Sequence, residues 1–303
     1  MNKKSKESLM ALPQVIGVGQ GFKEIGGITT AQKAILVLVK RKLPLEQLQK
    51  HQLVPKTLNG IVTDVIEVGN MEAHSVGNHT VTLQSYTTRM RPSAPGVSIG
   101  HYRTTAGTFG AVVYDRKTGQ PLMLSNNHVL ANSSNGRDMR AKIGDLILQP
   151  GAIDGGRTSE DAIARLKKYV ALNEYPRKNN VDCALAQPIN NELIVPEILG
   201  IGIVQGAITA KIGINVKKTG RTTGLTTGKI RAVNVTLNVG YGSGRTLRFE
   251  NQILTTNMSS GGDSGSLVMD ETNKAVGLLF AGSSQATLLN PIQKVLDLLN
   301  VEL

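Results

Sequence analysis

The residues best suited to chemistry lie in a glycine-rich stretch at positions 261–266, Gly-Gly-Asp-Ser-Gly-Ser. A nucleophilic serine needs an accessible hydroxyl and backbone N–H groups aimed at the oxygen that becomes negative in a tetrahedral intermediate. Glycines on both sides let the chain turn tightly around Ser264 without Cβ clashes. The N–H groups of Gly262 and Ser264 are therefore candidate oxyanion-hole donors. Asp, Ser and Gly are also common turn residues, so an ordinary turn is the alternative.

A serine hydroxyl needs a base, and His128 is the best candidate among five histidines. It follows the apolar run 122–125, so its neighbours can anchor in a core while its ring points into a cleft. The other four lie in polar or weakly patterned segments and are expected on the surface: His51, His74, His79 and His101. His74 and His79 are five residues apart and do not share a helix face, so no metal site is predicted.

A carboxylate must hold the imidazole in the correct tautomer and stabilise the imidazolium. Asp182 opens the apolar run 183–186 and is expected to be buried at the start of a strand. A buried aspartate without a partner is costly, and a histidine is a natural partner. Asp161 is the rival carboxylate, and a purely structural role for either aspartate stays open.

Several segments in one order carry a resemblance to a known family. Residues 124–129 (Leu-Ser-Asn-Asn-His-Val), 181–185 (Val-Asp-Cys-Ala-Leu) and 262–265 (Gly-Asp-Ser-Gly) resemble the His, Asp, Ser order of the trypsin/chymotrypsin superfamily. Residues 218–230 are similar to the segment that opens the second barrel in bacterial members. More narrowly, residues 95–101 and 105–110 resemble bacterial relatives of the plant narrow-leaf-type serine proteases. The resemblance covers about residues 90–303.

The resemblance implies a mainly β fold of two six-stranded barrels with the active site between them. His128 would then be the general base and acid, Asp182 its orienting partner and Ser264 the nucleophile, with the oxyanion hole at the N–H groups of Gly262 and Ser264. The implied activity is that of a serine endopeptidase, which hydrolyses a protein or peptide substrate through an acyl-enzyme. No metal or organic cofactor is implied.

The resemblance also places the substrate-binding residues. Met258 stands six positions before the nucleophile, where trypsin-like members set basic specificity, so cleavage after Lys or Arg is not expected. The stretch 275–280 with Gly282 and Ser283 would form one wall of the pocket. With Phe280 also in that wall, we expect a small or modestly apolar side chain at the cleaved position.

Periodicity divides the chain into two parts. Residues 14–22, 34–40 and 61–68 read as strands and 44–52 as a short helix with Leu45 and Leu48 inward, so residues 1–88 are predicted to form a small α/β domain. The near-continuous apolar run 34–40 indicates burial on both faces. Residues 69–95 are polar and end in a proline-rich stretch, as a linker would.

Residues 89–303 form the predicted catalytic domain. Short apolar runs separated by turn residues every 8 to 12 positions are typical of a β-barrel or sandwich. The expected strands are 108–115, 122–125, 145–149, 162–171, 182–187, 216–218, 228–239, 251–255, 266–269 and 275–280. The apolar positions of residues 290–299 mark one face of a C-terminal helix, with Pro291 in its first turn.

The composition indicates the cellular compartment. Cys183 is the only cysteine, so no internal disulfide can form, and we predict a reducing, cytoplasmic compartment. Residues 8–18 are interrupted by Pro13, Gln14 and Gly17, which argues against a signal peptide. No apolar stretch approaches 18 residues, so no membrane span is expected.

The formal charge of +12 raises the question of nucleic acid. About seven of these charges arise within residues 1–56, which hold ten Lys or Arg against three Glu and only one aromatic, Phe22. Nucleic acid is therefore an unlikely partner, because stacking platforms are lacking. Two alternatives to an enzyme stay open: a catalytically latent binding or scaffold protein on a protease fold, and a basic protein associated with nucleic acid. Homo-oligomer formation is also left open.

Overall fold

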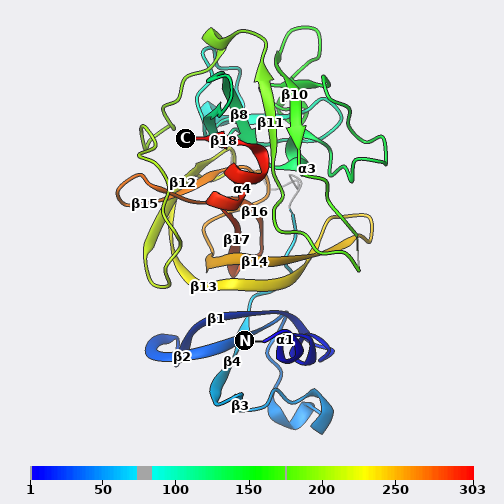
Figure 1. Ribbon diagram of the computed structural model, residues 1–303, viewed down its shortest axis with the longest axis vertical. Coiled ribbons are helices and arrows are strands. Elements are labelled where there is room, and N and C mark those ends of the chain that lie inside the picture. Colours follow the sequence, from blue (N-terminus) through cyan, green and yellow to red (C-terminus); the bar gives the residue numbers. More distant parts are fainter. Residues whose placement is uncertain (1, 74–83, 175) are drawn as a thin grey trace.

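The computed structural model describes residues 2–73, 84–174 and 176–303, and strands dominate it. Two antiparallel-rich sheets carry the fold, with the N-terminal strands stacked at one end of the molecule (Figure 1). Most predicted strands of residues 89–303 are present, with bounds that shift by a few residues. The expected C-terminal helix is present as α4 (Ile292–Leu299), although Pro291 is its N-cap rather than part of its first turn.

The first sheet has eight strands in the order β18-β7-β8-β11-β10-β9-β5-β6. Buried side chains such as Phe109, Met123 and Ile163 fill its interior. Its strands are β5 (Ser98–His101), β6 (Gly107–Thr108), β7 (Ala111–Asp115), β8 (Pro121–Ser125), β9 (Leu146–Leu148), β10 (Ala162–Tyr169), β11 (Ala184–Pro188) and β18 (Val301–Glu302).

The second sheet has ten strands, and six of them close into a ring. The order is β12-β15-β16-β17-β14-β13, and β12 pairs with β13 as well as with β15. A closed ring leaves no free edge among these strands. They are β12 (Asn215–Gly220), β13 (Gly224–Gly240), β14 (Thr246–Thr256), β15 (Leu267–Asp270), β16 (Ala275–Gly282) and β17 (Ala286–Pro291).

The N-terminal strands continue this second sheet through a β1–β13 ladder. They are β1 (Val15–Ile25), β2 (Ile28–Val39), β4 (Ile61–Glu67) and β3 (Thr57–Leu58), in that order from β13. Gly17 makes the ladder possible, because a Cβ there would lie 2.7 Å from the Cβ of Leu237. As predicted, residues 34–39 of β2 are buried on both faces.

The prediction of a helix at residues 44–52 is wrong. The chain instead forms two single 3₁₀ turns, η1 (Leu45–Gln47) and η2 (Lys50–Gln52), and Leu45 is 73% exposed. In each turn the hydrogen bond joins residues three apart, as from the Leu48 N–H to the Leu45 carbonyl, and this spacing makes a 3₁₀ turn instead of an α-helix.

The remaining helical elements are short. They are α1 (Lys3–Met10), α2 (Gln84–Thr87), α3 (Asn127–Leu130), η3 (Ala152–Asp154) and η4 (Asn191–Leu193). Among the described residues, no helix has the length and apolarity that crossing a membrane requires.

Candidate active site

His128 lies on α3, a single helical turn that directly follows β8. Its neighbours hold this turn in place. The Asn127 amide donates to the carbonyls of Ser134 (3.0 Å) and Val170 (2.7 Å), and Val129 and Leu130 are buried in the first core. With both sides anchored, the imidazole is positioned by rigid elements, as the sequence suggested.

Asp182 is fully buried just before β11, and each of its carboxylate oxygens accepts a hydrogen bond from His128. Its Oδ2 accepts from His128 Nδ1 at 2.6 Å, and its Oδ1 accepts from the His128 backbone N–H at 3.2 Å. Its own backbone is fixed, because its N–H donates to Asn290 Oδ1 (2.9 Å) and its carbonyl accepts from the Asn126 amide (2.7 Å). The carboxylate therefore has little freedom to turn away from His128.

This arrangement selects the tautomer of His128. Because Nδ1 faces a carboxylate, it carries the proton, and Nε2 is left with its lone pair. Nε2 is buried and has no hydrogen-bond partner among the described residues. A buried polar atom without a partner is costly. An imidazole presented in this way is ready to take a proton from a neighbouring hydroxyl.

Tyr241 is a third contact of the carboxylate that the sequence reasoning missed. Its hydroxyl donates to Asp182 Oδ2 at 2.6 Å, and its ring meets the His128 ring edge-on with centroids 6.0 Å apart. Burial raises the pKa of Tyr241 well above its ordinary value, and the nearby Asp182 charge raises it further. The phenol therefore stays protonated and acts as a donor.

We expect Tyr241→Phe to remove this donor while keeping the ring. A hydrogen bond to a charged group contributes about 1.5–3 kcal/mol, so the free energy of unfolding in urea should fall by about that amount. Tyr114→Phe is the matched control, because in the described part of the chain its half-buried side chain packs on the first core and its hydroxyl has no hydrogen-bond partner. Equal stability losses in both variants would contradict the role given to the Tyr241 hydroxyl.

Ser264 lies in the tight loop that the glycines predicted. Gly262 and Gly265 have φ angles of +99° and +97°, a region that favours glycine. A Cβ on Gly262 would meet Thr222 Oγ1 at 2.4 Å. Within the described residues, the backbone N–H groups of Gly262 and Ser264 make no internal hydrogen bond, so both are available as oxyanion donors.

Asp263 holds this loop through a fully buried carboxylate. Its Oδ1 accepts from the backbone N–H groups of Thr222 (2.9 Å) and Thr223 (3.1 Å). Its Oδ2 accepts from the Thr223 hydroxyl (2.6 Å), the Ser260 N–H (3.0 Å) and Lys218 Nζ (3.2 Å). Lys218 on β12 is also fully buried, and burial is the main reason that its pKa is lowered. Asp263 partly offsets the effect of burial on the pKa of Lys218, so the two side chains form a buried ion pair.

We expect Lys218→Met to cost about 3–5 kcal/mol of unfolding free energy, because it leaves a buried carboxylate without its cation. Urea unfolding measures this. Lys217→Met is the control: Lys217 is the next residue on the strand and points to the other side, so its loss should cost about 0.5 kcal/mol or less. Similar losses in the two variants would show that the buried pair does not hold the loop.

Ser264 and His128 approach each other around Gly107. A Cβ on Gly107 would lie 2.4 Å from Val129 Cγ2 and 2.9 Å from the Ser264 carbonyl oxygen, so this glycine separates the histidine turn from the serine loop. The Ser264 hydroxyl donates to the Phe280 carbonyl at 3.4 Å. It makes no hydrogen bond to His128 Nε2, which has no partner among the described residues.

The other carboxylate and most of the other histidines singled out in the sequence lie away from His128 or outside the described residues. Asp161 pairs with Arg89 (3.1 Å) and accepts from the Arg157 N–H, so Asp182 and not Asp161 contacts the histidine. His51 is exposed, as expected. His74 and His79 lie outside the described residues. Among the residues that are described, no cluster of three or more metal-binding side chains occurs.

The prediction that His101 lies on the surface is wrong. It is fully buried on β5, where its Nε2 lies 3.0 Å from Asp145 Oδ2 and its Nδ1 accepts from the Arg103 N–H at 3.1 Å. Burial is the main cause of its lowered pKa. All four residues of β5 are buried although Ser98 and His101 are polar, so residue type did not predict exposure on this strand.

The expected substrate-binding residues do not share one core cluster, since Met258 and Phe280 lie in different clusters. Met258 is buried in an apolar cluster, and the Phe280 ring packs on Phe249 with centroids 4.7 Å apart, so Phe280 faces Ser264 through its main chain. Gly282 ends β16, and the Ser283 hydroxyl donates to the Val68 carbonyl at 2.5 Å.

Arg221 links the two sheets beside the serine loop. Its guanidinium pairs with Asp154 of η3, and both side chains are at least nine-tenths buried. Ser98 on β5 donates to the same carboxylate at 2.5 Å. The Arg221 guanidinium also lies against the space that a Cβ on Gly262 would occupy. This pair therefore ties the loop that carries Ser264 to the sheet that carries His128.

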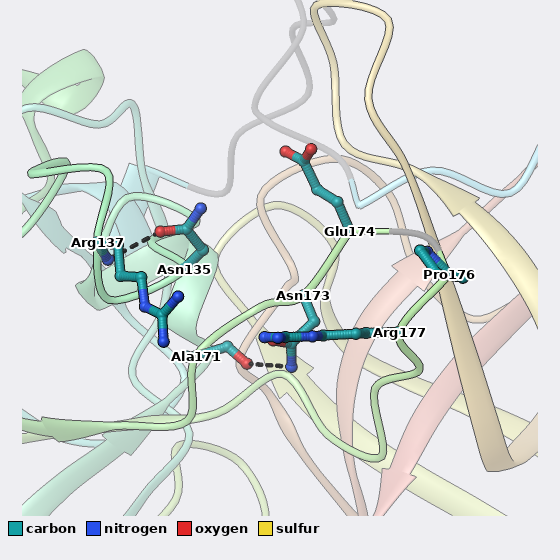
Figure 2. Close-up of a pocket in the computed structure, with 7 residues that line it drawn as sticks. All are labelled: Asn135, Arg137, Ala171, Asn173, Glu174, Pro176 and Arg177. Atoms are coloured by element: carbon teal, nitrogen blue, oxygen red, sulfur yellow. Dashed lines mark hydrogen bonds between the residues drawn. The ribbon is translucent and has the colours of Figure 1, made fainter.

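Two pockets lie in this part of the molecule. One of about 410 Å³ borders His128, Tyr241 and Ala73. The second, of about 420 Å³, is formed by the loops around Asn135 and Asn173, with the side chains of Arg137 and Arg177 at its wall (Figure 2). The described lining of the second pocket includes no serine, cysteine or histidine. The first pocket contains His128, whereas Ser264 is not among the described residues that line it.

Comparisons with known proteins identify the fold. A protease from Nocardiopsis matches 69% of this chain and 98% of its own, at 20% sequence identity and a TM-score of 0.50. A glutamic acid specific serine protease matches 70% of this chain and 100% of its own, also at 20% identity and a TM-score of 0.50. No family model and no curated protein matches the sequence. The chain therefore has the chymotrypsin-like fold, and the predicted fold class is confirmed.

Proposed function

We propose that this protein is a serine endopeptidase in which Ser264 attacks a peptide carbonyl and forms an acyl-enzyme. The observation that supports this best is the His128–Asp182 pair, whose Nε2 has no partner among the described residues. The turn that carries His128 meets the loop that carries Ser264 at Gly107. His128 takes the serine proton during attack and returns it to the leaving amine. The free N–H groups of Gly262 and Ser264 stabilise the oxyanion. These steps need no metal or organic cofactor.

The substrate is a protein or peptide with a small or modestly apolar side chain at the cleaved position. Support comes from the residue type of Met258, an uncharged residue six positions before Ser264. The proposal places Gly282 and Ser283 in the wall of the same site. The proposal includes a place among bacterial relatives of the narrow-leaf-type proteases, residues 1–88 and 89–303 as two domains, and a cytoplasmic setting. The lone, buried Cys183 supports that setting.

Labelling with an alkyl fluorophosphonate tests the assembled serine and base. We expect the wild type to be labelled and Ser264→Ala and His128→Ala to stay unlabelled, since the probe needs an activated serine. Intact-mass spectrometry identifies the adduct. Labelling that persists in Ser264→Ala would place the reactive group elsewhere and contradict the proposal.

A second candidate is a catalytically latent binding protein on this fold. One observation favours it: the Ser264 hydroxyl bonds the Phe280 carbonyl while His128 Nε2 has no partner among the described residues. A folded wild type that no fluorophosphonate labels would favour this candidate over the enzyme.

A further inference from the structure

Residues 68–73 (Val-Gly-Asn-Met-Glu-Ala), here called the 68–73 segment, lie between the ends of β16 and β13. Glu72 and Gly282 exchange two backbone hydrogen bonds as an antiparallel pair: Glu72 N–H to the Gly282 carbonyl (3.1 Å) and Gly282 N–H to the Glu72 carbonyl (3.0 Å). On the other side, Gly240 N–H donates to the Met71 carbonyl and Ala73 N–H donates to the Gly240 carbonyl, both at 2.9 Å. The segment is therefore bound as an added strand.

Side chains anchor the same segment. Val68 and Met71 are 0% and 3% exposed and lie in the core cluster that contains Phe280 and Ala281. The Ser283 hydroxyl donates to the Val68 carbonyl. The contacts combine a main-chain ladder with two apolar side chains in pockets, which is how extended peptides are recognised by strand addition.

The edge of β16 that the segment occupies also contacts Ser264. Residues two apart on a strand present their backbone groups to the same edge, so Phe280 and Gly282 share one edge of β16. The Phe280 carbonyl accepts from the Ser264 hydroxyl. A peptide paired antiparallel with Gly282 therefore runs towards Ser264.

The segment also follows this direction. Glu72 pairs with Gly282, and the next residue, Ala73, lines the pocket that His128 and Tyr241 border. A peptide substrate that pairs with β16 needs the N–H and carbonyl of Gly282, which Glu72 already uses. The two cannot bind at once.

We propose that the 68–73 segment is an internal pseudosubstrate. It occupies the strand-addition site for the residues that precede the cleaved bond of an extended peptide, and such a peptide binds only after the segment has withdrawn. This inference rests on the proposed peptidase function. It defines the substrate as an extended, unfolded stretch of chain that is recognised mainly through its backbone.

The expected effect follows from the population of the withdrawn state. A peptide that binds only the open form has its apparent affinity reduced by the open fraction. If about 1–10% of molecules are open, as is common for a minor conformer, weakening the segment raises reaction with extended peptides by about 10- to 100-fold. Reaction with a small probe that does not use Gly282 stays unchanged.

Two phosphonate probes separate these effects. The first is an alkyl fluorophosphonate, which reaches Ser264 without pairing with β16. The second is a diphenyl phosphonate of alanine preceded by Met-Glu-Ala, which copies residues 71–73. Labelling rates are measured for the wild type, Met71→Ala and Glu72→Pro. Met71→Ala removes the apolar anchor, and Glu72→Pro independently removes the N–H that bonds the Gly282 carbonyl.

Met10→Ala is the matched control, because Met10 is a buried methionine of the N-terminal core and has no part in the segment. We expect the peptidyl probe to react about 10-fold faster or more with Met71→Ala and Glu72→Pro than with the wild type. Met10→Ala should match the wild type, and the alkyl probe should react equally with all four.

Other outcomes overturn the inference in distinguishable ways. Equal peptidyl-probe rates in all four folded proteins, with normal alkyl labelling, refute the pseudosubstrate and leave the peptidase function standing. If the peptidyl probe reacts as much faster with Met10→Ala as with Met71→Ala, the increase comes from a general loosening of the fold, and the pseudosubstrate is refuted as well. Failure of the alkyl probe with every protein refutes the peptidase function and the inference with it.

Discussion

Ser264→Ala should lower the rate of peptide hydrolysis by up to about 10⁶-fold, because the variant lacks the oxygen that attacks the peptide carbonyl. The rest of the site stays in place: His128 keeps its bond to Asp182, and the N–H groups at Gly262 and position 264 remain. A residual rate of about 10³–10⁴ over the uncatalysed reaction is therefore expected from these groups.

The measurement is the initial rate of peptide hydrolysis, together with the amplitude of the acyl-enzyme burst. Ser284→Ala is the matched control, since Ser284 is an exposed serine in the turn after β16. It should keep both rate and burst. A Ser264→Ala protein that retained the wild-type rate would exclude the acyl-enzyme at this residue.

Asp182→Asn should lower turnover by about 10⁴-fold with little change in the fold of the site. The asparagine cannot hold the proton on His128 Nδ1 as the carboxylate does, so the imidazole presents the wrong tautomer to the serine. It also cannot stabilise the imidazolium that forms during attack. Asp182 is fully buried, so the asparagine occupies the same enclosed position without the negative charge.

Asp161→Asn is the matched control for this prediction. Asp161 was the rival carboxylate in the sequence, but in the structure it bonds Arg89 and the Arg157 N–H instead of the histidine. Its variant should keep turnover within a few-fold of the wild type. Equal losses of kcat in the two variants would mean that the Asp182 contact has no special part in the reaction.

Residue types alone predicted the contact between His128 and Asp182, but not the contacts that support it. Serine flanked by glycines, a histidine after a strand and an aspartate before one are local patterns. Tyr241 and Lys218 act on residues far along the chain, Tyr241 on Asp182 and Lys218 on Asp263. Only the pairing of distant strands brings each of them to its partner.

Strand positions were predictable for a related reason. The alternation of apolar residues marks a strand whose two faces differ, and it located most strands of residues 89–303. It failed for β5, which is buried on both faces and ends in His101 with Asp145 as its partner. It also carried no information on the β1–β13 ladder, because side-chain pattern does not specify which edge a strand joins.

The Lys218–Asp263 pair has a consequence for how the protein reaches its working state. The cation that fixes the serine loop is an internal side chain of β12, so it is in place as soon as the ring closes. Cutting the chain to create a new terminal ammonium is not needed to shape this loop. The ion pair that holds this loop therefore forms as part of folding.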